Sequence, residues 1–412
     1  MKILVLNRWV GYNQGGAETA VKDTIENFMN ENEITLITSR GDYTKYLHSK
    51  VDVEYVNIPK HYYSYGYLGL PLSILFFLCS LYKYFNLRIL RKKKFDLVIS
   101  FFSLDCVTSR FIRLIDKTPY VHIMQGTTSL EMIEGKRANK VIAISEFCRS
   151  QCLKNNFEAV KIVKGIDTQK FNFKKRKNDD LNKIPTFLTV CRLEPRKNLE
   201  TLIKACSILK KKNFNFKSII VGDGILMNQY QELSESHNLS ENIEFTGFIQ
   251  NNDPKLSKLY NNSDLFILPT LYECCGYVYL ESIACGLPII AANNSCMPEI
   301  VGDCGLLFNT EDYVDLAKKI EYFFTNQNIR NNIHDNIEKR HKDMSWTYVK
   351  PLYEEVFRDA ISNDQNLNFI RIKTFFFIVK DFFKIIVTLF KHQVIFNTKN
   401  TFQWSNKGMV GK

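Results

Sequence analysis

The stretch from Asp264 to Val301 constrains the fold of this chain more than any other part of the sequence. It opens with the apolar run DLFILP and continues, after a gap, with a second apolar run, PIIAA. The residues between them predict a loop and a short helix that ends at Cys285-Gly286, because glycine with Pro288 just beyond is a common helix terminus. The stretch therefore predicts half of a parallel β-α-β unit, in which ligands bind at the carboxyl ends of the strands.

Two glutamates lie eight residues apart in this stretch. We expect Glu273 in the loop and Glu281 in the first helical turn, so that both side chains face one crevice. The helix start near Gly276 and Tyr277 directs unpaired N–H groups to the same place, which suits a phosphate group. A surface loop and helix with two solvated glutamates is the alternative interpretation.

The spacing of Glu273 and Glu281, followed by ACGLP and PEIV, resembles the donor-site signature of GT-B glycosyltransferases. The resemblance is to the large retaining group called family 4, or glycosyl transferases group 1, and it covers about residues 1–360. It implies an α/β architecture of two doubly wound Rossmann-like domains that face a central cleft. It also implies that Glu281 holds the ribose of a nucleotide sugar and that Glu273 holds hydroxyls of the donor sugar near the reacting carbon.

Length and composition predict how the chain divides into domains. A chain of 412 residues suggests two domains, and the charged, turn-rich run FNFKKRKNDDLNKIP is typical of a linker. We predict an N-terminal acceptor-side domain (1–170), a linker (171–184) and a C-terminal nucleotide-sugar donor domain (185–345). By the resemblance, residues 346–362 form a crossover helix that returns to the first domain. Residues 366–412 are predicted to be a basic amphipathic extension.

The first domain carries weaker signals. Its opening strand leads into a Gly-Gly turn and an amphipathic helix, without the GxGxxG pattern of dinucleotide sites. The resemblance places Gly16 opposite the phosphates of the donor. Two positions depart from the family pattern: Gln125 stands where a histidine commonly lines the active site, and Lys164 stands where an asparagine usually precedes Gly165. The sequence leaves open whether Gln125 or His122 lines the site.

Two basic residues of the second domain are candidates for catalysis. Arg192 ends a predicted strand, and Lys197 lies just before a helix that Asn198 is positioned to cap. The resemblance implies that this arginine and lysine bind the donor diphosphate, where two fixed cations stabilise the charge on the leaving group. Solvated basic residues in a charged turn are the alternative. Gly222 and Phe248 are further predicted substrate-binding residues of this domain.

The charge of the chain points to anionic partners. The net charge is +12, and residues 366–412 contain eight Lys or Arg and one acidic residue. No nucleic-acid-binding motif accompanies this charge, so we favour an anionic membrane surface and phosphorylated substrates over nucleic acid. The apolar run Leu70–Tyr82 precedes a basic cluster, Arg91–Lys94, and is too short to span a bilayer. Both this run and the extension are either helices packed on the body of the protein or surfaces that lie on a membrane.

The remaining features concern the cellular compartment. The 11 cysteines show neither disulfide nor metal-site spacing, which indicates reduced thiols. The first residues lack the pattern of a secretory signal peptide. We therefore expect a cytoplasmic protein, peripheral on the inner face of the membrane.

Taken with the resemblance, these features predict a glycosyltransferase. It would move a sugar from a nucleotide diphosphate sugar, most simply of UDP or GDP, to a hydroxyl of a glycan or lipid-linked acceptor. The resemblance implies retention of the anomeric configuration, no metal and no cofactor, and a role in surface polysaccharide or glycoconjugate synthesis. The alternatives are a non-catalytic GT-B scaffold that binds sugar nucleotides or glycans, and a nucleotide-sugar epimerase, which needs no acceptor.

Overall fold

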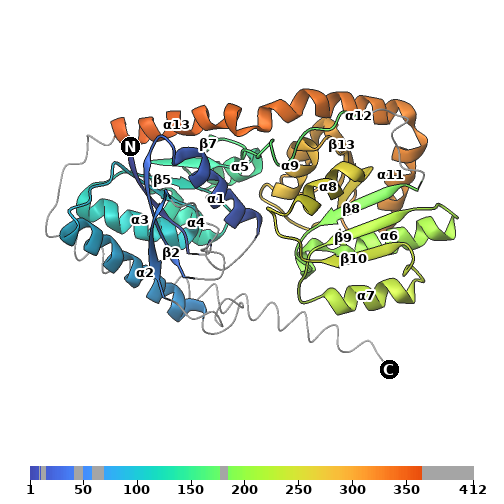
Figure 1. Cartoon of the computed structure of the whole chain (residues 1–412), viewed down its shortest axis with the longest axis horizontal. Helices are drawn as coiled ribbons and strands as arrows, with labels where there is room; N and C mark the ends of the chain where they lie inside the picture. The colour runs from blue at the N-terminus through green and yellow to red at the C-terminus, as the bar shows by residue number, and fades with distance from the viewer. Residues whose placement is uncertain (9, 11–14, 41–49, 58–68, 177–183, 364–412) are drawn as a thin grey trace.

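A computed structural model describes residues 1–8, 10, 15–40, 50–57, 69–176 and 184–363. Within these residues two parallel β-sheets, each flanked by helices, lie next to each other along the long axis of the molecule (Figure 1). This arrangement confirms the prediction of two doubly wound domains. The predicted amphipathic extension, residues 366–412, lies outside the described residues.

Among the described residues, the first sheet has seven strands in the order β3-β2-β1-β4-β5-β6-β7. Each neighbouring pair is parallel, and β1, β4 and β5 are almost entirely buried. Burial on both faces explains why these strands are continuous apolar runs, not alternating ones. The strands are β1 (Lys2–Leu6), β2 (Glu33–Ser39), β3 (Asp52–Val56), β4 (Leu97–Ser100), β5 (Tyr120–Ile123), β6 (Lys140–Ala143) and β7 (Val160–Lys161).

The second sheet has six described strands in the order β10-β9-β8-β11-β12-β13, again parallel. Its neighbouring strands β11 and β12 are buried at every residue and pair with each other, as the apolar runs DLFILP and PIIAA predict. The strands are β8 (Thr186–Val190), β9 (Lys217–Val221), β10 (Ile243–Gly247), β11 (Leu265–Leu268), β12 (Ile289–Ala292) and β13 (Gly305–Phe308).

Helices connect the parallel strands and cover both sheets. In the first domain they are α1 (Gly16–Phe28), α2 (Gly69–Phe85), α3 (Ser103–Asp116), α4 (Ser129–Gly135) and α5 (Glu146–Lys154). The second domain contributes α6 (Leu199–Lys211), α7 (Met227–Ser236), α8 (Pro254–Asn262), α9 (Tyr277–Ala284), α10 (Met297–Val301), α11 (Tyr313–Thr325) and α12 (Gln327–Arg340).

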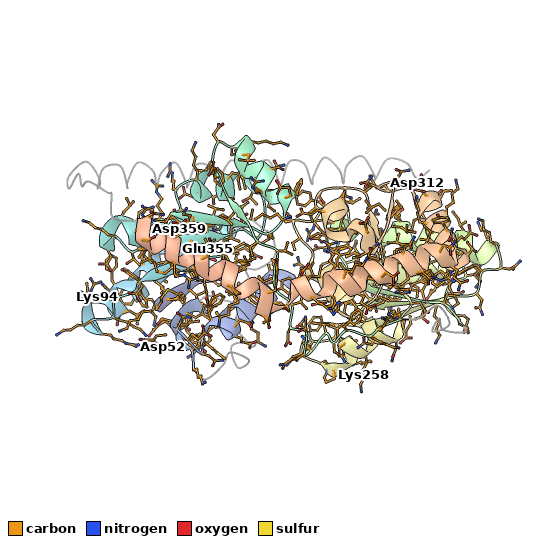
Figure 2. The ribbon with its side chains drawn as sticks, turned by 90° about the horizontal axis from the view of Figure 1, so that it is seen from above. Asp52, Lys94, Lys258, Asp312, Glu355 and Asp359 are labelled. Carbon is orange, nitrogen blue, oxygen red and sulfur yellow. The ribbon has the colours of Figure 1, made fainter. Side chains whose placement is uncertain are left out.

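The last described helix, α13 (Trp346–Ser362), returns to the first domain. Its apolar face packs on α1, where the rings of Phe28 and Phe357 lie 5.3 Å apart. Lys350 bonds Glu31 at 2.5 Å, and Asp359 forms an ion pair with Lys140 at the start of β6. Seen from above, the part of α13 that carries Glu355 and Asp359 lies over the first domain (Figure 2). The helix therefore ties the end of the second domain to the first.

Candidate active site

The two domains meet through the loops that follow β5 and β6 of the first sheet and β11 of the second. Thr127, after β5, forms a hydrogen bond with Tyr272, after β11. The Ser145 hydroxyl, after β6, donates to the carbonyl of Cys274 at 2.6 Å. The carboxyl ends of the two parallel sheets therefore face each other, and this is the place where open α/β sheets bind ligands.

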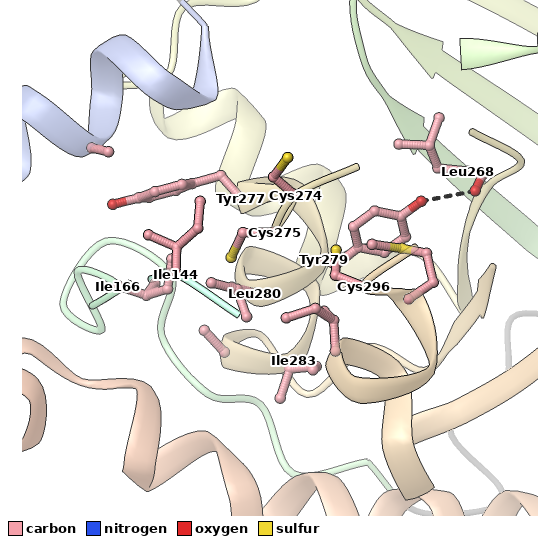
Figure 3. Close-up of a cluster of buried hydrophobic side chains, with 14 of the residues drawn as sticks. Ile144, Ile166, Leu268, Cys274, Cys275, Tyr277, Tyr279, Leu280, Ile283 and Cys296 are labelled. Atoms are coloured by element: carbon pink, nitrogen blue, oxygen red, sulfur yellow. Dashed lines mark hydrogen bonds between the residues drawn. The ribbon is translucent and has the colours of Figure 1, made fainter. Parts of the chain in front are cut away.

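The close contact between the domains is apolar as well as polar. Cys275 and Tyr277 lie next to Ile144 and Ile166 of the first domain in the buried cluster of Figure 3, which also contains Cys274. Inside the second domain, the Tyr279 hydroxyl donates to the Leu268 carbonyl at 2.9 Å and so fixes α9 against β11. These contacts hold the loop that carries Glu273 in one position.

Glu273 and Lys197 form an ion pair in which both residues are almost fully buried. Arg196 lies on the other side of the same carboxylate, with its Nη1 3.7 Å from Glu273 Oε2. The Glu273 backbone N–H also donates to Ser295 at 3.1 Å. Arg196 also pairs with Glu194 at 3.1 Å, and Arg192 lies 3.7 Å from that second carboxylate, so that three cations share two carboxylates and leave a local excess of positive charge. The sequence motif indicated Lys197 and Glu273 separately, but neither their pairing nor Arg196.

Arg192 lies in the loop that follows β8, two residues beyond the end of the strand. Its side chain is 57% exposed and lies 3.7 Å from Glu194, which also binds Arg196. The predicted cap at Asn198 is wrong. Asn198 adopts a left-handed conformation, with φ 53°, and its side chain makes no capping hydrogen bond to α6. The turn Pro195–Lys197 is a short 3-10 helix, and it directs Lys197 towards Glu273.

The N-termini of α1 and α9 converge at the junction. Gly276 precedes α9 with φ 70°, and a Cβ atom there would lie 2.6 Å from the Tyr279 ring, so the turn requires glycine. Gly16 begins α1, and a Cβ atom on it would lie 3.3 Å from Cβ of Tyr277. Two helix N-termini with their positive dipole ends are thus brought together, an arrangement that favours an anionic ligand.

Glu281 does not lie in the first turn of its helix, as we expected. Because α9 begins at Tyr277, Glu281 is one turn further along, and it is only 2% exposed. Its carboxylate accepts hydrogen bonds from the Tyr260 hydroxyl at 2.8 Å and from Asn251 Nδ2 at 3.0 Å. Burial raises the pKa of Glu281, although both donors oppose the shift. A ribose hydroxyl would have to share this carboxylate with Asn251.

A polar network that the sequence analysis missed connects Glu281 to the first domain. Lys170 donates to Asn251, which in turn binds Glu281. The Tyr277 hydroxyl lies 3.2 Å from Asp23 on α1. Burial, together with the Glu26 carboxylate, raises the pKa of Asp23 to about 7, so that this carboxyl is partly protonated near neutral pH. These residues lie far apart in the sequence, and no local pattern marks them.

The structure separates the roles of His122 and Gln125. His122 is fully buried in β5, and its two ring nitrogens lie 3.0 Å from the Ser100 hydroxyl and 3.2 Å from Glu131. The same Glu131 carboxylate accepts the backbone N–H of Gln125 at 2.9 Å. Lys164 donates to Oε1 of Gln125 at 2.8 Å. His122 is therefore a satisfied core histidine, while Gln125 faces a residue at the domain junction.

Gly222 and Phe248 lie at the carboxyl ends of β9 and β10, beside the strand that leads to Arg192. Gly222 adopts φ 141° and donates its N–H to the carbonyl of Gly247 at 2.9 Å. Phe248 is 48% exposed, so that about half of its surface is open to solvent or to a ligand. The close approach of the Cys191 carbonyl to Gly222 already explains why this residue is glycine. A contact between Gly222 and a substrate stays a prediction.

Comparisons with known proteins agree with this architecture. Residues 169–340 match the family model described as glycosyl transferases group 1. Over 182 residues the chain is 29% identical to the serotype-specific mannosyltransferase WbdA of Escherichia coli, covering 43% of this chain and 22% of the relative. It is 27% identical over 216 residues to the alpha-monoglucosyldiacylglycerol synthase of Streptococcus pneumoniae, covering 49% of this chain and 48% of the synthase. The chain therefore spans less than half the length of these curated relatives.

A solved structure extends the likeness over both domains. Anabaena HepE, crystallised in complex with UDP and glucose, superposes with a TM-score of 0.68 at 21% sequence identity. The superposition covers 87% of this chain and 99% of HepE. The fold is that of the GT-B glycosyltransferases. Residues 169–340, which match the glycosyl transferases group 1 model, carry Arg192, Lys197, Glu273 and Glu281.

Proposed function

We propose that this protein transfers a sugar from a nucleotide diphosphate sugar to a hydroxyl of a glycan or lipid-linked acceptor, in surface polysaccharide or glycoconjugate synthesis. One observation carries the proposal. In a GT-B fold with a group 1 domain, a cluster of three cations (Arg192, Arg196 and Lys197) and two carboxylates (Glu194 and Glu273) lies at the domain junction, beside the N-terminus of α9. Such a cluster suits a doubly charged leaving group.

In the proposed reaction the bond between the anomeric carbon and the diphosphate oxygen breaks. Lys197 and Arg192 stabilise the negative charge on the departing diphosphate, so that the reaction needs no metal ion. Glu273 holds hydroxyls of the sugar, and Glu281 holds the ribose. The acceptor oxygen attacks the same face of the sugar, its proton passes to the leaving phosphate, and the anomeric configuration is retained. The exposed Phe248 ring is placed to stack on the nucleobase.

UDP and GDP are the proposed donor nucleotides, and the UDP complex of HepE supports UDP. We expect one of the nucleoside diphosphates UDP, GDP and ADP to stabilise the protein, and the monophosphate CMP to stabilise it less. At a hundred times the dissociation constant the free energy of unfolding should increase by about 2.7 kcal/mol. Thermal unfolding measures this increase as a shift in the melting temperature. The Arg192→Ala variant should lose the shift, because it removes an exposed cation that the leaving group requires.

Lys204→Ala is the matched control for this experiment. Lys204 lies on α6 and pairs with Glu200 on the surface, so its loss removes one positive charge without touching the junction. Absence of stabilisation by every nucleotide would favour the non-catalytic scaffold. Conversion of a nucleotide sugar without any acceptor would instead favour the epimerase.

We also propose that the protein lies on an anionic membrane surface through α2 and the turn after it. Leu78 and Tyr82 of α2 and Leu90 of the following turn are large apolar residues with half or more of their surface exposed. Lys92 and Lys94 follow them and are exposed. Apolar side chains beside lysines suit a leaflet that contains anionic lipid. No helix in the described part of the chain is long and apolar enough to cross a membrane.

Vesicle binding tests this surface. We expect the full chain to sediment with vesicles that contain phosphatidylglycerol, and less with vesicles of phosphatidylcholine alone. Tyr82→Glu should lower the apparent affinity for the anionic vesicles about tenfold, because it removes an apolar anchor and adds a negative charge. Tyr322→Glu on α11 is the control, since Tyr322 is 44% exposed on the second domain. Equal binding by the two variants would contradict the proposal.

A further inference from the structure

Lys164 is a buried cation at the domain junction. It follows β7, directly precedes Gly165, and is only 6% exposed. The Gly165 carbonyl accepts a hydrogen bond from the Tyr277 hydroxyl at 3.2 Å, which ties this segment to the start of α9. The Lys164 backbone is therefore held where the first domain contacts the donor-side helix.

No carboxylate among the described residues lies within 4.0 Å of the Lys164 ammonium. Its Nζ donates to Oε1 of Gln125 at 2.8 Å and lies 5.0 Å from the centre of the Tyr277 ring. An ammonium group has three donors, and these contacts leave hydrogen-bonding capacity for a further acceptor. Lys197, by contrast, is paired with Glu273. A buried positive charge without a counter-charge is unfavourable unless an anion joins it.

From this arrangement we infer that Lys164 binds an anionic group, a carboxylate or a phosphate, that the substrate carries in addition to the donor diphosphate. The inference rests on the proposed function and adds the chemical class of the substrate to it. Lys164 would then be a specificity-determining residue of the first domain.

Gln125 fixes the position of the Lys164 ammonium group, which we infer binds the anion. Its Nε2 donates to the Ile123 carbonyl at 3.3 Å, and its backbone is held by Glu131, so that Oε1 points to Lys164. Gln125 and Lys164 are also the two residues at which the sequence departs from the family pattern. They contact each other, and the neutral amide accepts a hydrogen bond from lysine where a protonated histidine would repel it. The two residues that differ from the family pattern, Gln125 and Lys164, are therefore hydrogen-bonded partners.

The neighbours of Lys164 place it at the reacting end of the site. Tyr277 opens α9 next to Gly276, and a Cβ atom on Gly276 would lie 3.7 Å from Cγ of Glu273. The Cys275 thiol is also near the ammonium: burial raises the pKa of Cys275 to about 11, and Lys164 opposes the rise. Through Tyr277 and Cys275, Lys164 is therefore connected to the segment that carries Glu273.

The anion has two possible sources, and matched probes distinguish them. For the donor, the probes are UDP-glucuronate and UDP-glucose, or GDP-mannuronate and GDP-mannose if GDP is the stronger nucleotide. For the acceptor, the probes are glucose 1-phosphate and glucose, each added to protein saturated with the nucleotide. We expect the wild type to bind one charged probe about 10- to 100-fold more tightly than its neutral partner, the range for a hydrogen bond to a charged group. Isothermal titration calorimetry measures each pair.

Two substitutions link the preference to Lys164. Lys164→Met keeps all but the terminal atom of the unbranched side chain and removes the charge, so the preference for the charged probe should disappear. Gln125→Glu should also abolish it, because the new carboxylate pairs with Lys164 inside the protein. Lys164→Arg should retain the preference. Equal affinity of the wild type for charged and neutral probes in both pairs, or a preference that survives Lys164→Met, would overturn the inference. Failure of the wild type to bind any nucleotide would overturn the proposed function as well.

Discussion

Replacement of Lys197 by Met is expected to lower kcat for sugar transfer by about 10²–10³-fold, the usual cost of removing one donor that stabilises charge in the transition state. Lys197 is almost fully buried, so water cannot replace its ammonium group in full. Arg196 lies 3.7 Å from Glu273 and cannot move to the same place without leaving Glu194. Steady-state assays with saturating donor and acceptor measure kcat directly.

The ion pair between Lys197 and Glu273 requires a control for stability. Removing one partner of a buried pair destabilises a protein by about 3–5 kcal/mol, and Arg196 offsets part of this loss because it stays 3.7 Å from Glu273. The double variant Lys197→Met/Glu273→Gln removes both charges and should recover most of that loss in urea unfolding. We expect kcat to stay low in the double variant. Recovery of kcat together with stability would show that Lys197 acts only as a structural partner of Glu273.

The sequence predicted the elements around the site because their signals are local. The Cys285-Gly286 terminus of α9 requires a left-handed glycine, and Gly286 indeed has φ 77°. The strands β11 and β12 are recognised from their uninterrupted apolar runs, which only a sheet covered on both faces explains. The resemblance added the order of the two domains and the return of α13, which no local pattern contains.

The contacts within the site could not be predicted in the same way. Lys197 and Glu273 are 76 residues apart, and only the pairing of β8 with β11 brings their loops together. Glu131, which holds the Gln125 backbone, lies in the first turn of a short helix capped by Thr128; the T-x-x-E pattern marks the helix start but not the contact with Gln125. The position of Glu281 was wrong by one turn because the start of α9 depends on Gly276 and its contact with Tyr279, not on a capping side chain.

Gly222→Ala is expected to produce the largest loss of stability among single substitutions at the site. An alanine Cβ would lie 1.8 Å from the Cys191 carbonyl oxygen, and φ 141° is a conformation that residues other than glycine rarely adopt. Neither the backbone carbonyl nor the β9 strand can shift without breaking the sheet. We expect the free energy of unfolding to fall by about 4 kcal/mol or more, measured by urea denaturation.

Gly247→Ala is the matched control at the end of the neighbouring strand. Gly247 also has a positive φ, 73°, but nothing lies within 4 Å of an added Cβ atom. This substitution should therefore cost only the backbone strain of a left-handed alanine, about 1–2 kcal/mol. Since Cys191 directly precedes Arg192, the clash in Gly222→Ala should also displace Arg192 and weaken nucleotide binding, whereas Gly247→Ala should not. Similar losses of stability in the two variants would contradict the steric explanation and leave substrate contact as the reason for glycine at position 222.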